Sequence, residues 1–170
     1  MRKGSPYKSY LRNLNHISKF TVMFTKDLTV IYEKNLLQLK QELELFKDEK
    51  NIWLTAGNIS NSAGNLCLHL TGNLNHFIGA GLGNTGYVRN RDAEFSLKNV
   101  SQTEMISQID ATIEMLKKVL PGLSEDELGK DSPKSTPGRE MTVGYLLLHL
   151  LAHFNYHLGQ INYLRRLLEV

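Results

Sequence analysis

Histidines are concentrated in two apolar stretches of the chain, at intervals that suit metal binding. His149, His153 and His157 follow one another four residues apart in the last stretch. On a helix, neighbours at this interval lie about 6 Å apart along the axis and about 40° apart around it, so two of them can reach one ion. The outer two would be about 12 Å apart, too far for two metal–nitrogen bonds of about 2 Å. One pair from this series can therefore bind a metal ion.

The apolar residues around these histidines indicate which pair faces inward. They recur every three or four residues, at Leu146, Leu150, Phe154, Ile161, Leu164 and Leu168. At about 100° per residue, His157 falls within this stripe, His153 at its flank and His149 a further ~40° toward solvent. We therefore predict that His153 and His157 project into the interior of the fold.

The other stretch can supply a further ligand, which the pair needs because a Zn²⁺-like ion usually takes four. His69 and His76 would share a helix face but lie about 10 Å apart along it, so only one can join the site. An ion on three histidines keeps one position open, which is typical of catalytic sites. The alternative is that these histidines are core or surface residues satisfied by hydrogen bonds, because such intervals also arise by chance.

Helical periodicity predicts the elements that must position these histidines. Apolar residues spaced by three or four mark four long helices, over residues 25–47, 60–79, 101–120 and 142–168. No run of alternating apolar and polar residues predicts a strand. The expected fold is therefore all-α, an antiparallel four-helix bundle.

Polar residues mark where several of these helices begin. Ser60 or Ser62 can cap the second helix, and the third opens with a capping box from Ser101 to Glu104. Residues 124–127 can start one short extra turn after it. Each of these positions predicts a helix start from local chemistry alone.

Two long loops interrupt the helices. Four glycines within residues 79–86 cannot continue a helix, so a long linker is expected between the second and third helices. Residues 129–140 contain two prolines and two glycines and predict another long loop before the last helix. Long loops of this kind often carry function. A further loop over residues 48–58 is expected to be anchored to the core by Trp53.

Composition limits the classes of protein to which the chain can belong. Its 170 residues suffice for one domain, and 41% of them are hydrophobic. It has no apolar run of the roughly 18 residues that a membrane span requires, and no secretory signal is recognisable. The only cysteine, Cys67, is expected to fill the core and suits a reducing, cytoplasmic location.

The net charge of +3 comes mainly from the start of the chain. Residues 1–22 contain five basic residues and no acidic one, and the rest is nearly neutral, so a nucleic-acid partner is not expected. We interpret residues 1–24 as a basic N-terminal extension, of which the sequence leaves the order open, and residues 25–170 as the bundle domain. Met23 is a candidate natural start.

Three motifs carry a resemblance to a known family. The run from His153 to Gln160, His-Phe-Asn-Tyr-His-Leu-Gly-Gln, is similar to the HxxxHxGQ signature that closes the DinB/YfiT-like bundle. Residues 65–74, which contain His69, resemble that family's second-helix motif, and residues 86–95 resemble the loop of a subfamily of small bacterial DinB-like proteins. The resemblance covers residues 25–168.

This resemblance implies a bundle, often dimeric, with a Zn²⁺- or Ni²⁺-type ion on three histidines and a water. It implies His69, His153 and His157 as the ligands, while His76 and His149 are extra and are expected to support the site from outside or to lie on the surface. Metal should then be released as pH falls below about 6, because ligating imidazoles must be neutral. Characterised relatives include bacillithiol- or mycothiol-dependent S-transferases, a mycothiol-dependent isomerase and proteins induced by DNA damage.

Several other polar residues are candidates for substrate contact or catalysis. Ligating histidines usually donate their second N–H to a carboxylate or carbonyl, and the loop carboxylates Asp92 and Glu94 are nominated for that role or for proton transfer. Asn73 and Gln160 are expected to line the cavity. In the same loop Arg89 and Arg91 could pair with an anionic substrate such as a low-molecular-weight thiol, or instead fix the loop by salt bridges.

Two functions remain open from the sequence. The first is a metal-dependent enzyme, a thiol S-transferase or a hydrolase that acts on a small molecule. The second is a non-enzymatic, stress-related metal-binding or scaffold protein. A homodimer is expected in either case, because residues on the outer side of the last helix are large and partly apolar, namely Tyr145, Tyr156, Tyr163 and Leu167.

Overall fold

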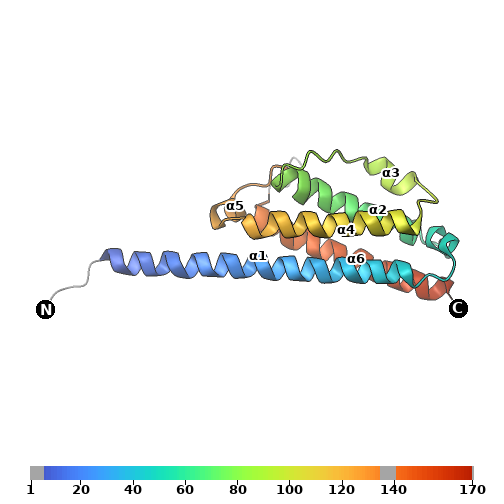
Figure 1. The fold of residues 1–170 in the computed structure, drawn as a ribbon, viewed down its shortest axis with the longest axis horizontal. Helices are drawn as coiled ribbons and strands as arrows, with labels where there is room; N and C mark the ends of the chain where they lie inside the picture. Colours follow the sequence, from blue (N-terminus) through green and yellow to red (C-terminus); the bar gives the residue numbers. More distant parts are fainter. Residues whose placement is uncertain (1–5, 135–140, 170) are drawn as a thin grey trace.

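A computed structural model describes residues 6–134 and 141–169, with side chains from residue 19 onward. Four long helices lie side by side: α1 (Pro6–Glu44), α2 (Ala63–Leu74), α4 (Gln102–Val119) and α6 (Val143–Leu168) (Figure 1). Two short helices, α3 (Arg91–Ser96) and α5 (Glu125–Gly129), lie in the connections. The prediction of an all-α fold is confirmed, since no described residue belongs to a strand.

The directions of the helices differ from the predicted antiparallel order. α2 runs opposite to α1, but α4 runs in the same direction as α2, and α6 in the same direction as α1 (Figure 1). The cause is the connection between α2 and α4, which passes back along the molecule before α4 begins. The predicted long linker is therefore a crossover, residues 83–101, and its helix α3 packs on α2.

The core forms where the apolar faces of the four long helices meet. Tyr32, Leu36 and Leu39 of α1 are fully buried there, as the predicted periodicity requires. The Tyr32 hydroxyl donates a hydrogen bond of 2.7 Å to the Leu147 carbonyl of α6, which satisfies the one polar atom of that side chain. Cys67 is also buried, as expected, and burial raises its pKa to about 12, so its thiol is inert at neutral pH.

The predicted starts of α2, α4 and α6 agree with the structure, whereas that of α1 does not. Ser62, Ser101 and Thr142 each accept a backbone hydrogen bond as the N-cap of α2, α4 and α6. Ser124 and Glu127 form a complete capping box at the start of α5, the predicted extra turn. Local capping chemistry was therefore a reliable guide to where helices begin.

The structure differs from the prediction at two places in the first 60 residues. α1 begins at Pro6, well before the predicted start at residue 25, and its first part extends beyond the other helices (Figure 1). A 3-10 helix at Glu49–Trp53 follows α1, where a plain loop was expected. Trp53 is buried against Gly64 of α2, which confirms it as the anchor of this connection.

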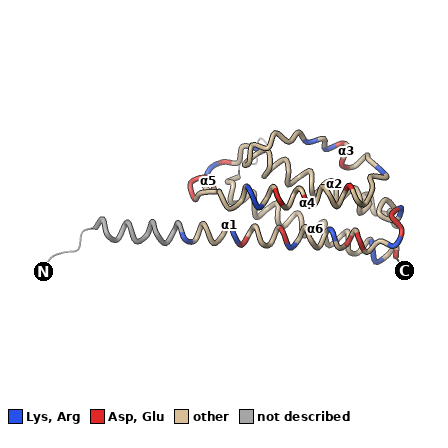
Figure 2. The backbone as a smooth tube through the Cα atoms, viewed as in Figure 1, with Lys and Arg blue, Asp and Glu red and all other residues tan. Residues whose placement is uncertain are grey.

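The long helices differ in the charge they carry. No Lys, Arg, Asp or Glu lies in α2, and only Arg165 and Arg166 lie in α6. Along the part of α1 that Figure 2 colours, basic and acidic positions are interspersed, whereas α4 has its acidic positions first and two lysines in its last turn. None of the described helices has the length and apolar character needed to cross a membrane. Part of the predicted 129–140 loop, residues 135–140, lies outside the described residues.

Candidate metal centre

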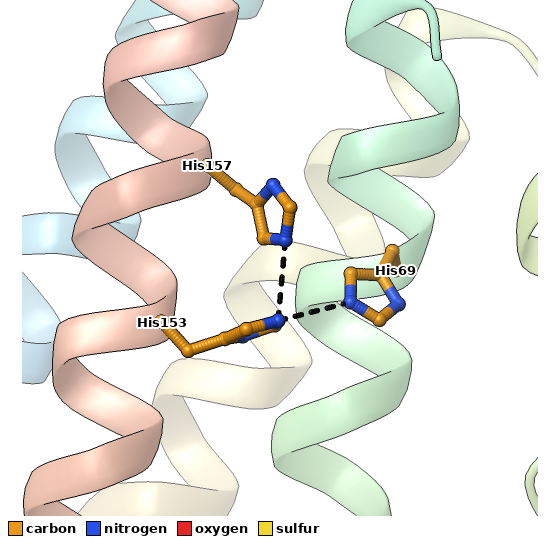
Figure 3. A group of neighbouring side chains, drawn as sticks. All are labelled: His69, His153 and His157. Carbon is orange, nitrogen blue, oxygen red and sulfur yellow. Dashed lines mark hydrogen bonds between the residues drawn. The ribbon is translucent and has the colours of Figure 1, made fainter. Parts of the chain in front are cut away.

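Three histidine side chains from two helices converge on one point. His69 comes from α2, and His153 and His157 come from successive turns of α6 (Figure 3). The Nε2 atom of His153 lies 3.3 Å from Nε2 of His69 and 3.1 Å from Nε2 of His157. One nitrogen from each ring lies within 4.8 Å of the other two, so the three can share one ion.

These separations fit a tetrahedral metal ion. Two nitrogens bonded to such an ion at about 2.0–2.1 Å stand about 3.3 Å apart. The two separations from His153, 3.1 and 3.3 Å, already have this value. Since the third pair of nitrogens, from His69 and His157, also lies within 4.8 Å, the residues present fit a divalent ion of the Zn²⁺ type.

Hydrogen bonds at the far nitrogens orient two of the rings. His69 Nδ1 lies 2.9 Å from Oε2 of Glu94, and His157 Nδ1 lies 2.6 Å from Oε1 of Gln160. Each Nδ1 donates, because an ionised carboxylate and an amide oxygen can only accept. The Nε2 atoms of both rings then carry lone pairs directed toward His153, as metal ligands require.

Hydrogen bonds among the three rings cannot pair all of their Nε2 atoms. His153 Nε2 can donate one N–H, which can pair with the lone pair of His69 or of His157 but not with both. His153 Nδ1 is buried and has no hydrogen-bond partner among the described residues. A cation at the point of convergence would pair with all three Nε2 lone pairs at once.

Burial keeps the α6 imidazoles neutral. It lowers the pKa of His153 to about 4, with a further contribution from the neighbouring His157 and His69. Burial also lowers the pKa of His157, although the hydrogen bond with Gln160 acts in the opposite direction. Both rings are therefore in the uncharged, ligating form at neutral pH.

Glu94 is the carboxylate that serves the site. It is buried and receives two hydrogen bonds from Arg89, from Nε at 2.7 Å to Oε1 and from Nη2 at 2.8 Å to Oε2. Burial alone would raise the pKa of Glu94, but the hydrogen bonds from Arg89 and His69 outweigh it and lower the pKa. Glu94 is thus ionised and fully paired, which suits orientation of His69 better than proton transfer.

A glycine makes room for this carboxylate. Gly72 lies one turn after His69 on α2, and a Cβ atom there would overlap Oε1 of Glu94. The cap of α3 brings Glu94 to this position, because the Asn90 side chain accepts a hydrogen bond from the Ala93 backbone N–H. A glycine inside an apolar helix was the sequence signal for this close approach.

A cavity of about 280 Å³ adjoins the histidines. His69 and His153 form part of its wall, together with the buried Asn73. Its apolar wall consists of Phe77, Met141, Leu146 and Leu150. The volume is close to the lower end of the roughly 300–1,000 Å³ of known ligand cavities, so a metabolite-sized molecule fits.

The helix that carries His69 widens beside this cavity. After Leu74 the chain forms a π-helical turn at Asn75–Ala80, where the sequence predicted a plain helix to Gly79. Asn75 Nδ2 donates to the Thr71 carbonyl and to the Thr112 hydroxyl, 2.9 Å from each. π-Helical turns inside helices are frequent at functional sites, and this one contributes Phe77 to the cavity.

Not every predicted site residue reaches the centre. His76 and His149 were expected to lie outside the ligand set, and neither belongs to the group of three rings. His149 is exposed, stacks on Tyr145 and lines the cavity. Asp92 is exposed on α3 and does not line the cavity. Lys134, which does line it, was missed because nothing local in the sequence relates it to α2 or α6.

Comparisons with known proteins agree with this architecture. The model of a family described as "Protein of unknown function (DUF1572)" matches residues 17–170, and no curated protein matches the sequence. The fold is similar to the crystal structure of a DinB-like protein from Bacillus cereus ATCC 10987, with a TM-score of 0.56 and 19% identity over 78% of this chain and 84% of that one. The resemblance to DinB-like proteins is thereby confirmed, and at this identity the structural likeness concerns the fold.

Proposed function

Because this chain belongs to the DUF1572 family, whose fold is DinB-like, we propose from its histidine centre that it is a metal-dependent enzyme acting on a small molecule. The observation that carries the proposal is the convergence of three Nε2 atoms beside a cavity. A closed structural site would use a fourth protein ligand. In this centre the neighbouring space is a cavity large enough for a substrate.

Each residue of the centre has a distinct proposed role. His69, His153 and His157 would hold the ion, and Glu94 and Gln160 fix two of the rings through their Nδ1 atoms. A bound Zn²⁺ or Ni²⁺ ion would supply Lewis acidity and one open position for a substrate atom.

We propose thiol S-transfer as the first reaction to test and hydrolysis as the second. In S-transfer the thiol gives up its proton, its sulfur bonds to an electrophilic carbon, and the leaving group departs with the electron pair of the broken bond. The resemblance of the three motifs to the DinB/YfiT-like proteins supports this choice, together with the lowering of a thiol's pKa that a nearby metal produces. A non-enzymatic metal-binding role is the competing function, and the pairing of Glu94 favours it, since no free carboxylate in the described cavity wall can act as base.

Metal content and turnover test the proposal together. The chain is purified without a His-tag, its metal is measured by elemental analysis, and the loaded protein is mixed with a chromogenic electrophile and one thiol at a time. Bacillithiol, glutathione, coenzyme A and cysteine form the panel. We expect about one ion per chain and turnover with one thiol that a chelator abolishes.

Two variants make this test specific. His157→Ala should lower bound metal by about tenfold or more, because two ligands remain of three. His149→Ala is the matched control on the same helix and should keep the metal. Absence of stoichiometric metal would overturn the proposal, and so would loss of metal from His149→Ala but not from His157→Ala. A metal-loaded protein with flat traces for every thiol and for ester hydrolysis would favour the non-enzymatic role.

A further inference from the structure

The cavity beside the histidines is lined by charges of one sign. Arg89, Arg91 and Lys134 all contribute to its wall. No aspartate or glutamate of the described chain does so. Three cations around a small space repel one another unless something negative lies between them.

Only one of these cations is neutralised within the described chain. Arg89 forms a two-point ion pair with the buried Glu94, so its charge is neutralised within the crossover. Arg91 has an aromatic platform instead, with its guanidinium carbon 5.3 Å from the centre of the Phe95 ring. No described acidic side chain forms an ion pair with Arg91 or with Lys134.

The same positive charges act on a histidine next to the cavity. The pKa of His76, next to the cavity residue Phe77, is lowered by burial and then by the positive charges of Arg89 and Lys134. Glu94 acts in the opposite direction without reversing the shift. The surroundings of His76 therefore disfavour its charged form.

We infer that the cavity binds a small anionic molecule and that Arg91 and Lys134 contact its carboxylate or phosphate group. An arginine held on an aromatic ring can present two N–H groups to such an anion, and a lysine adds a point charge. The apolar wall of Phe77, Met141, Leu146 and Leu150 accommodates a short hydrocarbon body. The inference rests on the proposed function in one respect, namely that this molecule is the substrate of the histidine centre.

The structure shows that the two loop arginines are not equally available to bind an anion. Arg89 and Arg91 lie two residues apart and looked equivalent as partners of an anion. Arg89 is engaged by Glu94 on two atoms, whereas Arg91 is exposed and reachable from solvent. Lys134 comes from a different part of the chain and completes the pair of available charges.

Titration with three four-carbon probes tests the inference. Butyrate, butylphosphonate and the neutral butyramide are added separately to the full chain as purified, and binding is followed by amide shifts in ¹H–¹⁵N NMR spectra. We expect butyrate or butylphosphonate to bind at least ~10-fold more tightly than butyramide, because charge-assisted hydrogen bonds are the stronger ones. The ratio between the two anions distinguishes a carboxylate ligand from a phosphate ligand.

Matched variants assign the effect to the two residues. Arg91→Gln with Lys134→Gln should weaken anion binding by about tenfold or more and leave butyramide unchanged. The control is Arg166→Gln with Lys118→Gln, because Arg166 also lies over an aromatic ring, 6.0 Å from the centre of Tyr163, but neither residue lines this cavity. The control should bind as the original chain does.

The outcomes distinguish the inference from the proposed function. Equal binding of the anions and butyramide, or equal binding to both double variants, would overturn the inference, as would no binding of either anion. Repeating the titration after treatment with a chelator separates the cavity charges from any metal. If the chain holds no metal but still binds the anion through Arg91 and Lys134, the metal-dependent function fails and the anion site stands.

Discussion

At the scale of single residues, the centre depends on a short chain of contacts that ends at His69, one of the three proposed metal ligands. Arg89 holds Glu94, Glu94 holds the Nδ1 of His69, and the opposite nitrogen of that ring faces the other histidines. Glu94 is 5% exposed, so removal of either partner would leave a charge in a largely dry environment. The geometry of the ligand therefore depends on residues that never touch the ion.

Gly72→Ala tests this dependence without changing any polar group. The new Cβ atom would displace the Glu94 carboxylate from His69, and we expect metal affinity to fall ~10-fold, the usual effect of losing such a partner. The helix itself should not suffer, because alanine has the better helix propensity by about 1 kcal/mol. Gly159→Ala is the control, since nothing lies within 4 Å of a Cβ at that α6 position. Competition with a chromophoric chelator measures both, and equal affinities would refute the role of Glu94.

Metal should be released at a lower pH than the pKa of an unperturbed imidazole would predict. The pKa of His153 lies near 4 and that of His157 is also lowered, so protons compete with the ion only at lower pH than the ~6.5 of an unperturbed histidine. A lowered pKa keeps the ring in its neutral, ligating form to lower pH, so metal binding should persist into more acidic solution. We expect metal to remain bound at pH 6.5 and to be released as pH approaches 4. Dialysis across this range with elemental analysis checks it, and complete release above pH 6.5 would contradict the assignment of these ligands.

At the scale of elements, local signals predicted where helices begin but not how they are arranged. Caps at Ser62, Ser101 and Thr142 act within one turn, so they are legible in the sequence. The parallel course of α2 and α4 is set by the crossover, which depends on contacts far apart along the chain. The choice of Glu94 over Asp92 depends on the same crossover, because it is the packing of α3 on α2 that brings Glu94 to His69.

Two of the three histidines could be placed from local spacing, and the third could not. His153 and His157 lie four residues apart on one helix, and the apolar stripe of α6 gave their direction. The position of His69 opposite them required the pairing of α2 with α6, which the motif resemblance supplied and periodicity did not. Lys134 had neither signal, and only the folded chain relates it to the cavity.

The start of α1 provides a test at this scale. α1 begins at Pro6, yet the described side chains of Phe20, Val22 and Met23 are exposed. We expect deletion of residues 1–22 to change the free energy of unfolding by only ~0.5 kcal/mol, because the apolar side chains described in this segment, Phe20 and Val22, are exposed. Urea denaturation of the two forms measures the difference. A loss above ~2 kcal/mol would show that this segment packs on the remainder of the fold.

At the scale of the whole molecule, the outer face of α6 suggests how copies of the chain associate. Tyr145, Tyr156, Tyr163 and Leu167 are all more than half exposed. Large apolar or aromatic residues gathered on one face commonly mark an interface, and a homodimer uses the same face twice. We therefore expect a dimer at tens of micromolar, measured by light scattering.

Substitution on this face should shift the equilibrium to monomer. Tyr163→Arg would place a charge in the expected interface and is predicted to weaken association by about tenfold or more. Val88→Arg is the control, because Val88 is an exposed apolar residue that belongs to the crossover and not to α6. A chain that is monomeric before any substitution, or one whose dimer survives Tyr163→Arg, would rule out this interface.

The placement of the histidines on two helices has a consequence for the unfolded chain. His69 and His153 are separated by 84 positions. An ion bound by both would be a reversible cross-link that closes a long loop of the chain. Closing a loop of roughly this length by a disulfide restricts the unfolded ensemble by the equivalent of about 4–5 kcal/mol, and a ligand bound only to the folded form adds stability with its free concentration. The supply of metal in the cell would then govern how much of this protein survives proteolysis as well as how much is active.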